Sequence, residues 1–252
     1  MQNCYYPLPV QPQLPVPVDD DAPMQRLDKS RGSSDEMRRP FMQLGAVSGA
    51  AGSAYVELGR TRVVCAVYGP RTDTRARREF SKDGQLVCDV KFAPFADKLT
   101  RRERGQDPDE MELSAIVQEA LAPAVMLHKL PKCILSVFVT ILEDDGGVFA
   151  SVINCASLAL ADAAVEMYDM VTAASAGIVK GSVIFDPSRE EEQRGDGMLA
   201  LAYMPSMGQV TYMLQAGKIH HTQLQEAVDL CTDACTGVMR SLLTASLVKA
   251  LT

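Results

Sequence analysis

Apolar residues recur along the first third of the chain with the period of β-strands. Two runs rich in β-branched and aromatic residues, 54–58 and 61–68, are separated only by residues 59–60, which is the two-residue spacing of a β-hairpin. A further strand is predicted over residues 86–92. The highly charged residues 71–79, between it and the hairpin, are predicted to form a loop.

The middle of the chain changes to the period of helices. Residues 112–129 carry apolar side chains at the spacing of a core-facing helix, and Pro123 is expected to kink it. Residues 134–142 are predicted to form a buried strand. The helix predicted over residues 150–168 is apolar on all sides, so we expect it to lie inside the domain.

The last third repeats this plan. Strands are predicted over residues 173–179, 183–186, 199–204 and 209–214, and a long amphipathic helix over residues 222–249. The order is strands, helix, strand, helix, strands, helix. It predicts an α+β fold of two similar β/α halves, in which mixed sheets pack on helices.

Composition places the chain among globular proteins that bury a full core. It has 252 residues, of which 47% are hydrophobic and 23% charged. Asp162, Glu166 and Lys180 interrupt the longest apolar stretches before they reach the roughly 18 residues of a membrane span. We expect no membrane association and no export signal.

The first 30 residues differ in composition from the rest. Six of the fourteen prolines lie within residues 1–23, together with the acidic triplet 19–21. Such a segment cannot offset the entropy of ordering by burial, so residues 1–30 are predicted to be a disordered tail and residues 31–252 the folded domain. The tail, with Tyr5 and Tyr6, is either inert or a peptide ligand for a partner.

The cysteines indicate a reducing compartment and no metal site. They are scattered, odd in number and mostly inside apolar runs, at positions 4, 65, 88, 133, 155, 231 and 235. Cys231 and Cys235 share one helical face, and His220 and His221 precede them without further ligands at zinc spacing. We therefore expect neither a metal nor a cofactor.

One segment has the form of an anion site but lacks the side chains for it. Gly146 and Gly147 lead directly into the apolar helix, and free N–H groups at a helix start suit a phosphate. The next residues, Val148 and Phe149, offer neither a donor nor a charge, and the two aspartates before the glycines would repel an anion. We interpret this turn as a degenerate phosphate site.

Several blocks of sequence together resemble the ribonuclease PH family. They are residues 52–65, 118–125, 158–163 and 186–192, and the likeness extends over about residues 39–251. Within the family, residues 161–169 and the proline-rich tail most resemble ring subunits of the eukaryotic RNA exosome. The resemblance implies a ribonuclease PH-like fold.

The resemblance also implies where catalysis would occur. Active members degrade RNA from the 3′ end by phosphorolysis and hold phosphate with Gly-Gly-Thr-Arg, where this chain has Val148 and Phe149. Asp186 and Glu190 leave carboxylates near the family's second, acidic element, so we interpret them as a degenerate acidic site. Losing one transition-state donor costs about 10² to 10³ in rate, and two are missing. We expect a non-catalytic subunit; the alternative is an active phosphate-dependent 3′-to-5′ exoribonuclease subunit.

RNA contact is expected at one basic cluster. The net charge of −7 argues against a free-standing RNA binder, but Lys98, Arg101, Arg102 and Arg104 lie within seven residues. The resemblance places this loop toward the central channel of a ring, where single-stranded RNA passes. A solvated loop without a ligand explains the cluster about equally well.

The resemblance implies partners as well. They are other ribonuclease PH-like exosome ring subunits and RNA-binding cap subunits, with RNA processing, rRNA maturation and RNA degradation in the nucleus, nucleolus and cytoplasm as the setting. A stand-alone scaffold with no role in RNA metabolism is the remaining alternative.

Overall fold

The computed structural model describes residues 26, 31, 33–72, 83–97 and 108–251. Its first sheet contains β1 (Pro40–Leu44), β2 (Gly52–Leu58), β3 (Thr61–Thr72), β4 (Gln85–Phe92) and β5 (Cys133–Glu143), in the spatial order β1-β2-β3-β5-β4. Neighbours are antiparallel except β4 and β5, which are parallel. The predicted hairpin is confirmed as β2 and β3.

The second sheet contains β6 (Thr172–Val179), β7 (Ser182–Phe185), β8 (Gly197–Met204) and β9 (Gln209–Gly217), in the order β7-β6-β8-β9. All its pairs are antiparallel, so the expectation of mixed sheets holds only for the first sheet. The four strands lie where the sequence predicted them, with ends that differ by a few residues. The α+β fold of two β/α halves is confirmed.

Two helices lie between the sheets. α1 (Pro108–Leu121) contacts β4 and β9, and α2 (Val148–Asp162) contacts β2 and β3 on one side and β6 and β8 on the other. Every α2 residue from Phe149 to Leu160 is buried. The predicted all-apolar inner helix is therefore confirmed: α2 is the centre of the core that the halves share.

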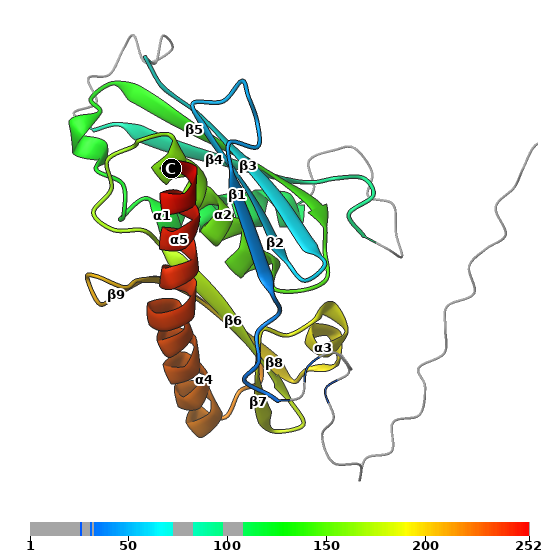
Figure 1. Ribbon diagram of the computed structural model, residues 1–252. Helices are drawn as coiled ribbons and strands as arrows, with labels where there is room; N and C mark the ends of the chain where they lie inside the picture. Colours follow the sequence, from blue (N-terminus) through cyan, green and yellow to red (C-terminus); the bar gives the residue numbers. More distant parts are fainter. Residues whose placement is uncertain (1–25, 27–30, 32, 73–82, 98–107, 252) are drawn as a thin grey trace, which may run out of the picture.

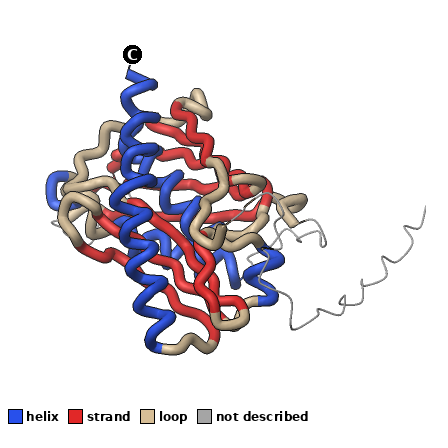
Figure 2. The backbone as a smooth tube through the Cα atoms, turned by 60° about the horizontal axis from the view of Figure 1, so that its bottom comes forward, coloured by secondary structure: helices blue, strands red, loops and turns tan. Residues whose placement is uncertain are grey.

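A nearly continuous helical segment closes the chain. α4 (His221–Ala234) packs on β6, β7 and β8, a π-helical turn follows at Cys235–Met239, and α5 (Arg240–Leu251) continues to α2 and β1. Figure 2 shows this segment running along most of the body. The single long helix predicted here is thus confirmed, except that a change of hydrogen-bond register divides it.

Both internal helices end earlier than the sequence suggested. α1 stops at Leu121 instead of continuing through a kink to residue 129, because Pro123 has no N–H to offer and its ring blocks the next turn; a short 3-10 helix, Leu127–Lys129, follows. α2 stops at Asp162 rather than residue 168, because Ala164 takes φ +52° and the Val165 N–H donates to the Leu160 carbonyl. Alanine at a position that usually needs glycine left no signal.

Three smaller features were missed or placed differently. β1 is an edge strand, and the six-residue α3 (Arg189–Arg194) is short; neither has a clear periodic pattern. Arg71 and Thr72, predicted as loop, are the last residues of β3, and residues 73–79 of that predicted loop lie outside the described residues. The tail and domain boundary predicted at residues 30 and 31 also stays a prediction, because the structure describes only Arg26 from the tail.

Candidate functional site: a filled anion site between the halves

The glycine turn lies where the two halves of the molecule meet. β5 ends at Glu143, and Gly146 and Gly147 take φ values of +87° and +64° before α2 begins. A Cβ on Gly147 would lie 2.7 Å from Nη2 of Arg38, and one on Gly146 would lie 2.5 Å from the backbone nitrogen of Arg189. The glycines therefore make room for this chain's own residues, whereas the sequence suggested room for a ligand.

A carboxylate from α3 occupies the anion position at the start of α2. The Gly147 N–H donates to Oε1 of Glu192 at 2.8 Å, and the Gly146 N–H donates to Oδ1 of Asp144 at 3.1 Å. Burial is the main cause that raises the pKa of Glu192, which Asp144 also raises, while the Gly147 N–H lowers it. The N–H at the positive end of the helix dipole is thus paired with an internal carboxylate.

Val148 and Phe149 pack into the core and give the site no polar atoms. Phe149 is 5% exposed, and its ring lies 6.1 Å from that of Tyr212 on β9, measured between centroids. Val148 is partly buried against the same core cluster. The sequence interpretation that these two side chains carry no anion-binding chemistry agrees with their positions.

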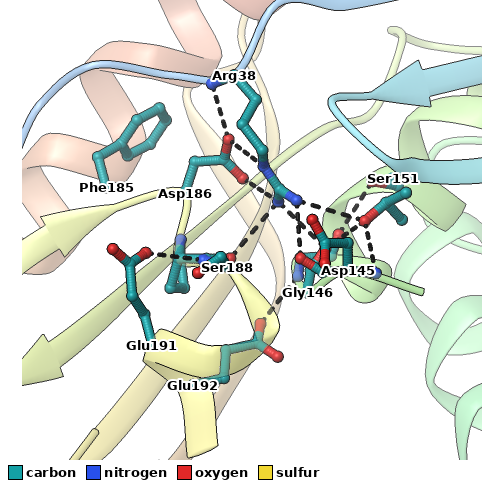
Figure 3. Close-up of polar contacts among 12 residues, drawn as sticks. Arg38, Asp145, Gly146, Ser151, Phe185, Asp186, Ser188, Glu191 and Glu192 are labelled. Atoms are coloured by element: carbon teal, nitrogen blue, oxygen red, sulfur yellow. Dashed lines mark hydrogen bonds and ion pairs between the residues drawn. The ribbon is translucent and has the colours of Figure 1, made fainter. Parts of the chain in front are cut away.

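Arg38, which the sequence analysis did not single out, is the centre of the site. Its guanidinium donates to both carboxylate oxygens of Asp186, from Nε at 2.9 Å and from Nη2 at 2.5 Å, and its backbone N–H donates to Oδ2 at 2.9 Å (Figure 3). It also donates to the carbonyls of Asp145 at 2.9 Å and Gly146 at 3.1 Å. Arg38 therefore joins the turn of the first half to the second half.

The pKa of Arg38 is raised even though burial acts to lower it. The hydrogen bonds and the charge of Asp186 outweigh the desolvation, with smaller contributions from Asp145 and Glu192. The guanidinium therefore stays charged and is neutralised inside the protein. Within the described residues, this is the arginine next to the glycine turn, and its donors point to protein oxygens.

The two members of the predicted acidic site are placed in different environments. Asp186 is 3% exposed, takes φ +51° directly after β7 and also accepts from Arg31, whose Nη1 donates to its carbonyl at 2.7 Å. Glu190 is exposed in the first turn of α3. Asp186 is held by arginines and Glu190 faces outward, so the pair predicted at Asp186 and Glu190 does not form a joint site. The carboxylate at the glycine turn is instead that of Glu192.

Two further side chains support the turn. Thr61 at the start of β3 donates from Oγ1 to the Gly146 carbonyl at 2.7 Å. Arg189 donates from Nη1 to Asp144 at 3.1 Å and from Nη2 to Asp97 at 2.7 Å. Arg189 thereby ties the turn to the residues just before the basic cluster. Lys98, Arg101, Arg102 and Arg104 themselves lie outside the described residues.

The cysteine and histidine positions agree with a structural role. Cys231 and Cys235 are fully buried, and burial raises the pKa of each thiol to about 12. His220 and His221 are exposed at the start of α4. Among the residues that the structure describes, no three His, Cys, Asp or Glu side chains are grouped as metal ligands would be, and no helix is long and apolar enough to cross a membrane.

The sequence could not reveal the residues that fill the site. Arg38 and Glu192 lie 108 and 46 positions from Gly146 and belong to no motif with it. The one available signal was charge: the chain between Arg189 and Arg194 is rich in carboxylates and follows Asp186 directly. That signal pointed to the correct segment but to the wrong member of it.

Comparisons with known proteins agree with the two halves seen here. The models of the 3′ exoribonuclease family, domains 1 and 2, match residues 36–166 and 169–234, and the boundary between them falls between α2 and β6. Two solved structures share the fold. They are rice Rrp46 (TM-score 0.73, 21% identity, 85% of this chain and 99% of that one) and an Archaeoglobus fulgidus exosome with RNA bound to the active site (0.74, 24%, 84% and 91%).

Relatives of known name are more similar in sequence. Exosome complex component RRP41-like of Arabidopsis thaliana is 38% identical over 222 residues, covering 88% of this chain and 84% of the relative. Exosome complex component MTR3 of Mus musculus is 36% identical and that of Homo sapiens 38% identical, each over 239 residues, covering 89% of this chain and 85% of the relative. The likeness of residues 161–169 and the tail to exosome component 6, the mRNA-transport-regulator type, agrees with these names. The chain belongs to the 3′ exoribonuclease family of ribonuclease PH type.

Proposed function

We propose that this chain is a non-catalytic ring subunit of the RNA exosome, the 3′-to-5′ RNA processing and degradation complex. In this role it contributes to ring assembly and to RNA threading in rRNA maturation and RNA turnover, in the nucleus, nucleolus and cytoplasm. Its partners are other ribonuclease PH-like ring subunits, RNA-binding cap subunits and single-stranded RNA in the channel. The relatives named as exosome components support this assignment.

One observation carries the proposal that the subunit is non-catalytic. The N–H at the start of α2, where a phosphate would bind, is bonded to the carboxylate of Glu192, and the neighbouring Arg38 is neutralised by Asp186. An incoming phosphate would have to displace a buried negative charge and would meet Val148 and Phe149 in place of donors. Two missing donors of this kind correspond to about 10⁴ to 10⁶ in rate.

A phosphorolysis assay tests this directly. The purified chain, mixed with RNA, inorganic phosphate and magnesium, should release no nucleoside diphosphate above the level without protein. Val148→Asp serves as the matched control, because an aspartate suits the first turn of a helix but repels phosphate. Phosphate-dependent release by the wild type that Val148→Asp abolishes would establish the alternative, an active phosphate-dependent exoribonuclease subunit.

RNA threading rests on the basic cluster Lys98, Arg101, Arg102 and Arg104. Asp97, held by Arg189 next to the glycine turn, fixes where this segment leaves the described body. Changing Arg101, Arg102 and Arg104 together to Glu should leave assembly intact and weaken crosslinking of channel RNA. The control carries the same change of charge at Arg60, Lys218 and Lys249, which are exposed elsewhere. Equal crosslinking by both variants would contradict the role of the cluster.

A further inference from the structure

The first sheet has one face on which no helix lies within the described part of the chain. α1, α2 and α5 all pack on its other face, as Figure 1 shows. Inward side chains such as Val63 and Val139 are at most 1% exposed, whereas their outward neighbours are open to solvent. We call the outward side of β1 to β5 the open face; Phe41, Tyr55, Tyr68, Val87 and Phe138 represent its apolar part.

The open face presents large apolar side chains in fixed arrangements. Phe41, Val87 and Phe138 are 51%, 38% and 44% exposed. The rings of Phe138 and Tyr68 meet edge to face with centroids 5.8 Å apart, and those of Phe41 and Tyr55 do so at 6.3 Å. Exposed aromatic residues on a rigid sheet are typical of surfaces that bind another protein.

The charges on the open face compensate one another. Nε of Arg62 lies 3.0 Å from Glu57 and its Nη1 lies 3.7 Å from Glu143, while Nζ of Lys91 lies 3.3 Å from Asp89. Each of these cations has a carboxylate beside it, so they provide no surplus of positive charge for a phosphate backbone. The charge pattern therefore favours a protein as the ligand over RNA.

The size of the open face matches a folded partner. Five strands spaced about 4.8 Å apart and about seven residues long cover roughly 24 by 24 Å, or about 600 Å² before side-chain relief is counted. A standard interface buries about 800 Å² on each partner. A single peptide strand would cover less than half of this width, so the occupant must be as broad as the sheet.

We infer that the open face is the surface on which a neighbouring chain of the same family docks in the ring. This inference rests on the proposed function and names the surface that would be used. The occupant it specifies is a folded chain with a near-neutral, partly aromatic surface about as broad as a five-stranded sheet. Phe138 lies on β5, between β3 and β4, and is the position where a charge should disturb docking most.

Reconstitution with the other ring chains tests the inference. Phe138→Glu is compared with Met213→Glu, a control on β9 of the second sheet that is 49% exposed and equally apolar. Because a central aromatic contact in an interface carries much of the binding, Phe138→Glu should weaken association about tenfold or more, measured by native mass spectrometry across a concentration series. Both isolated variants should melt within about 4 °C of the wild type.

The outcomes separate this inference from the proposed function. If the wild type fails to join any family chain, the proposed function fails. If the wild type and Phe138→Glu assemble equally while Met213→Glu does not, the proposed function stands and the open face is not the docking surface. Homodimers of the isolated chain that Phe138→Glu disrupts, or RNA crosslinked to Phe138, would also overturn the inference, because they assign the face to another occupant.

Discussion

Two arginines of this chain each bind carboxylate oxygens, but in opposite surroundings. Arg38 is 7% exposed between the two halves and donates to Asp186 and to backbone carbonyls. The side chain of Arg62 is 47% exposed on the open face, where it bridges Glu57 and Glu143. The same chemistry therefore has two uses: the buried cluster fixes the fold and fills a former ligand position, and the exposed cluster keeps a surface neutral.

The difference lies in the consequence of losing one partner. A buried charge without its partner keeps the full penalty of desolvation, whereas an exposed charge returns to water. Mutations in the buried cluster should therefore reduce folding stability, and mutations in the exposed cluster should act mainly on association. The changes below test this contrast from the largest expected effect to the smallest.

Asp186→Ala should have the largest effect. It removes the acceptor of three Arg38 hydrogen bonds and leaves a buried guanidinium, which typically costs about 3 to 5 kcal/mol. Urea unfolding followed by circular dichroism measures the loss. Glu190→Ala, on the exposed carboxylate of α3, removes the same charge and should change stability by no more than about 0.5 kcal/mol. Equal losses in the two variants would contradict the role given to Asp186.

Gly147→Ala should come next. The residue takes φ +64°, and the new Cβ would lie 2.7 Å from Nη2 of Arg38, so the variant suffers both backbone strain and displacement of the buried pair. We expect a loss of about 1 to 3 kcal/mol in the same unfolding experiment. Gly45→Ala is the matched control, because it has a similar φ of +69° and no atom within 4 Å of the new Cβ. A larger loss at Gly45 would remove the packing part of the argument.

The contrast between these two clusters also explains what the sequence could predict. The strands, the buried helix α2 and the final helix follow from periodic apolar positions, since periodicity is a local property of the chain. The ends of α1 and α2 were placed too late, because Pro123 terminates rather than kinks and Ala164 adopts a glycine-like conformation. The two-glycine turn was recognised because its residues are adjacent.

The site itself depends on residues that are distant in sequence. Arg38, Thr61, Asp186 and Glu192 meet only after both sheets have packed on α2, and no spacing between them is diagnostic. The sequence analysis therefore identified what the turn lacks but not what fills it. For the same reason it could not indicate which side of the first sheet stays uncovered.

Glu192→Gln should change the pH dependence of stability more than its magnitude. Burial raises the folded-state pKa of Glu192 above its unfolded value, against the effects of the Gly147 N–H and Arg38. The stabilisation linked to its proton is therefore complete below the unfolded pKa of about 4.3 and is lost as the pH rises through the folded pKa. Glutamine does not titrate but still accepts from the Gly147 N–H.

Unfolding curves of the wild type and Glu192→Gln across a pH series measure this. The wild type should lose stability relative to the variant as the pH increases through that range, and the difference should level off at neutral pH. Glu190→Gln controls for removal of a negative charge from the same helix. A difference between wild type and Glu192→Gln that does not vary with pH would contradict the burial of an ionised Glu192 at the glycine turn.

Arg62→Ala should have the smallest effect on folding and thereby completes the contrast. Its side chain lies in solvent, so the isolated variant should unfold at the same temperature as the wild type, and added salt should not separate the two. In the ring, however, the change leaves Glu57 and Glu143 uncompensated on the open face. Association should therefore weaken at low salt and recover as salt screens the two carboxylates, as a salt series in the reconstitution assay would detect. Reduced stability with unchanged association would assign Arg62 to the fold and remove the distinction between the two arginines.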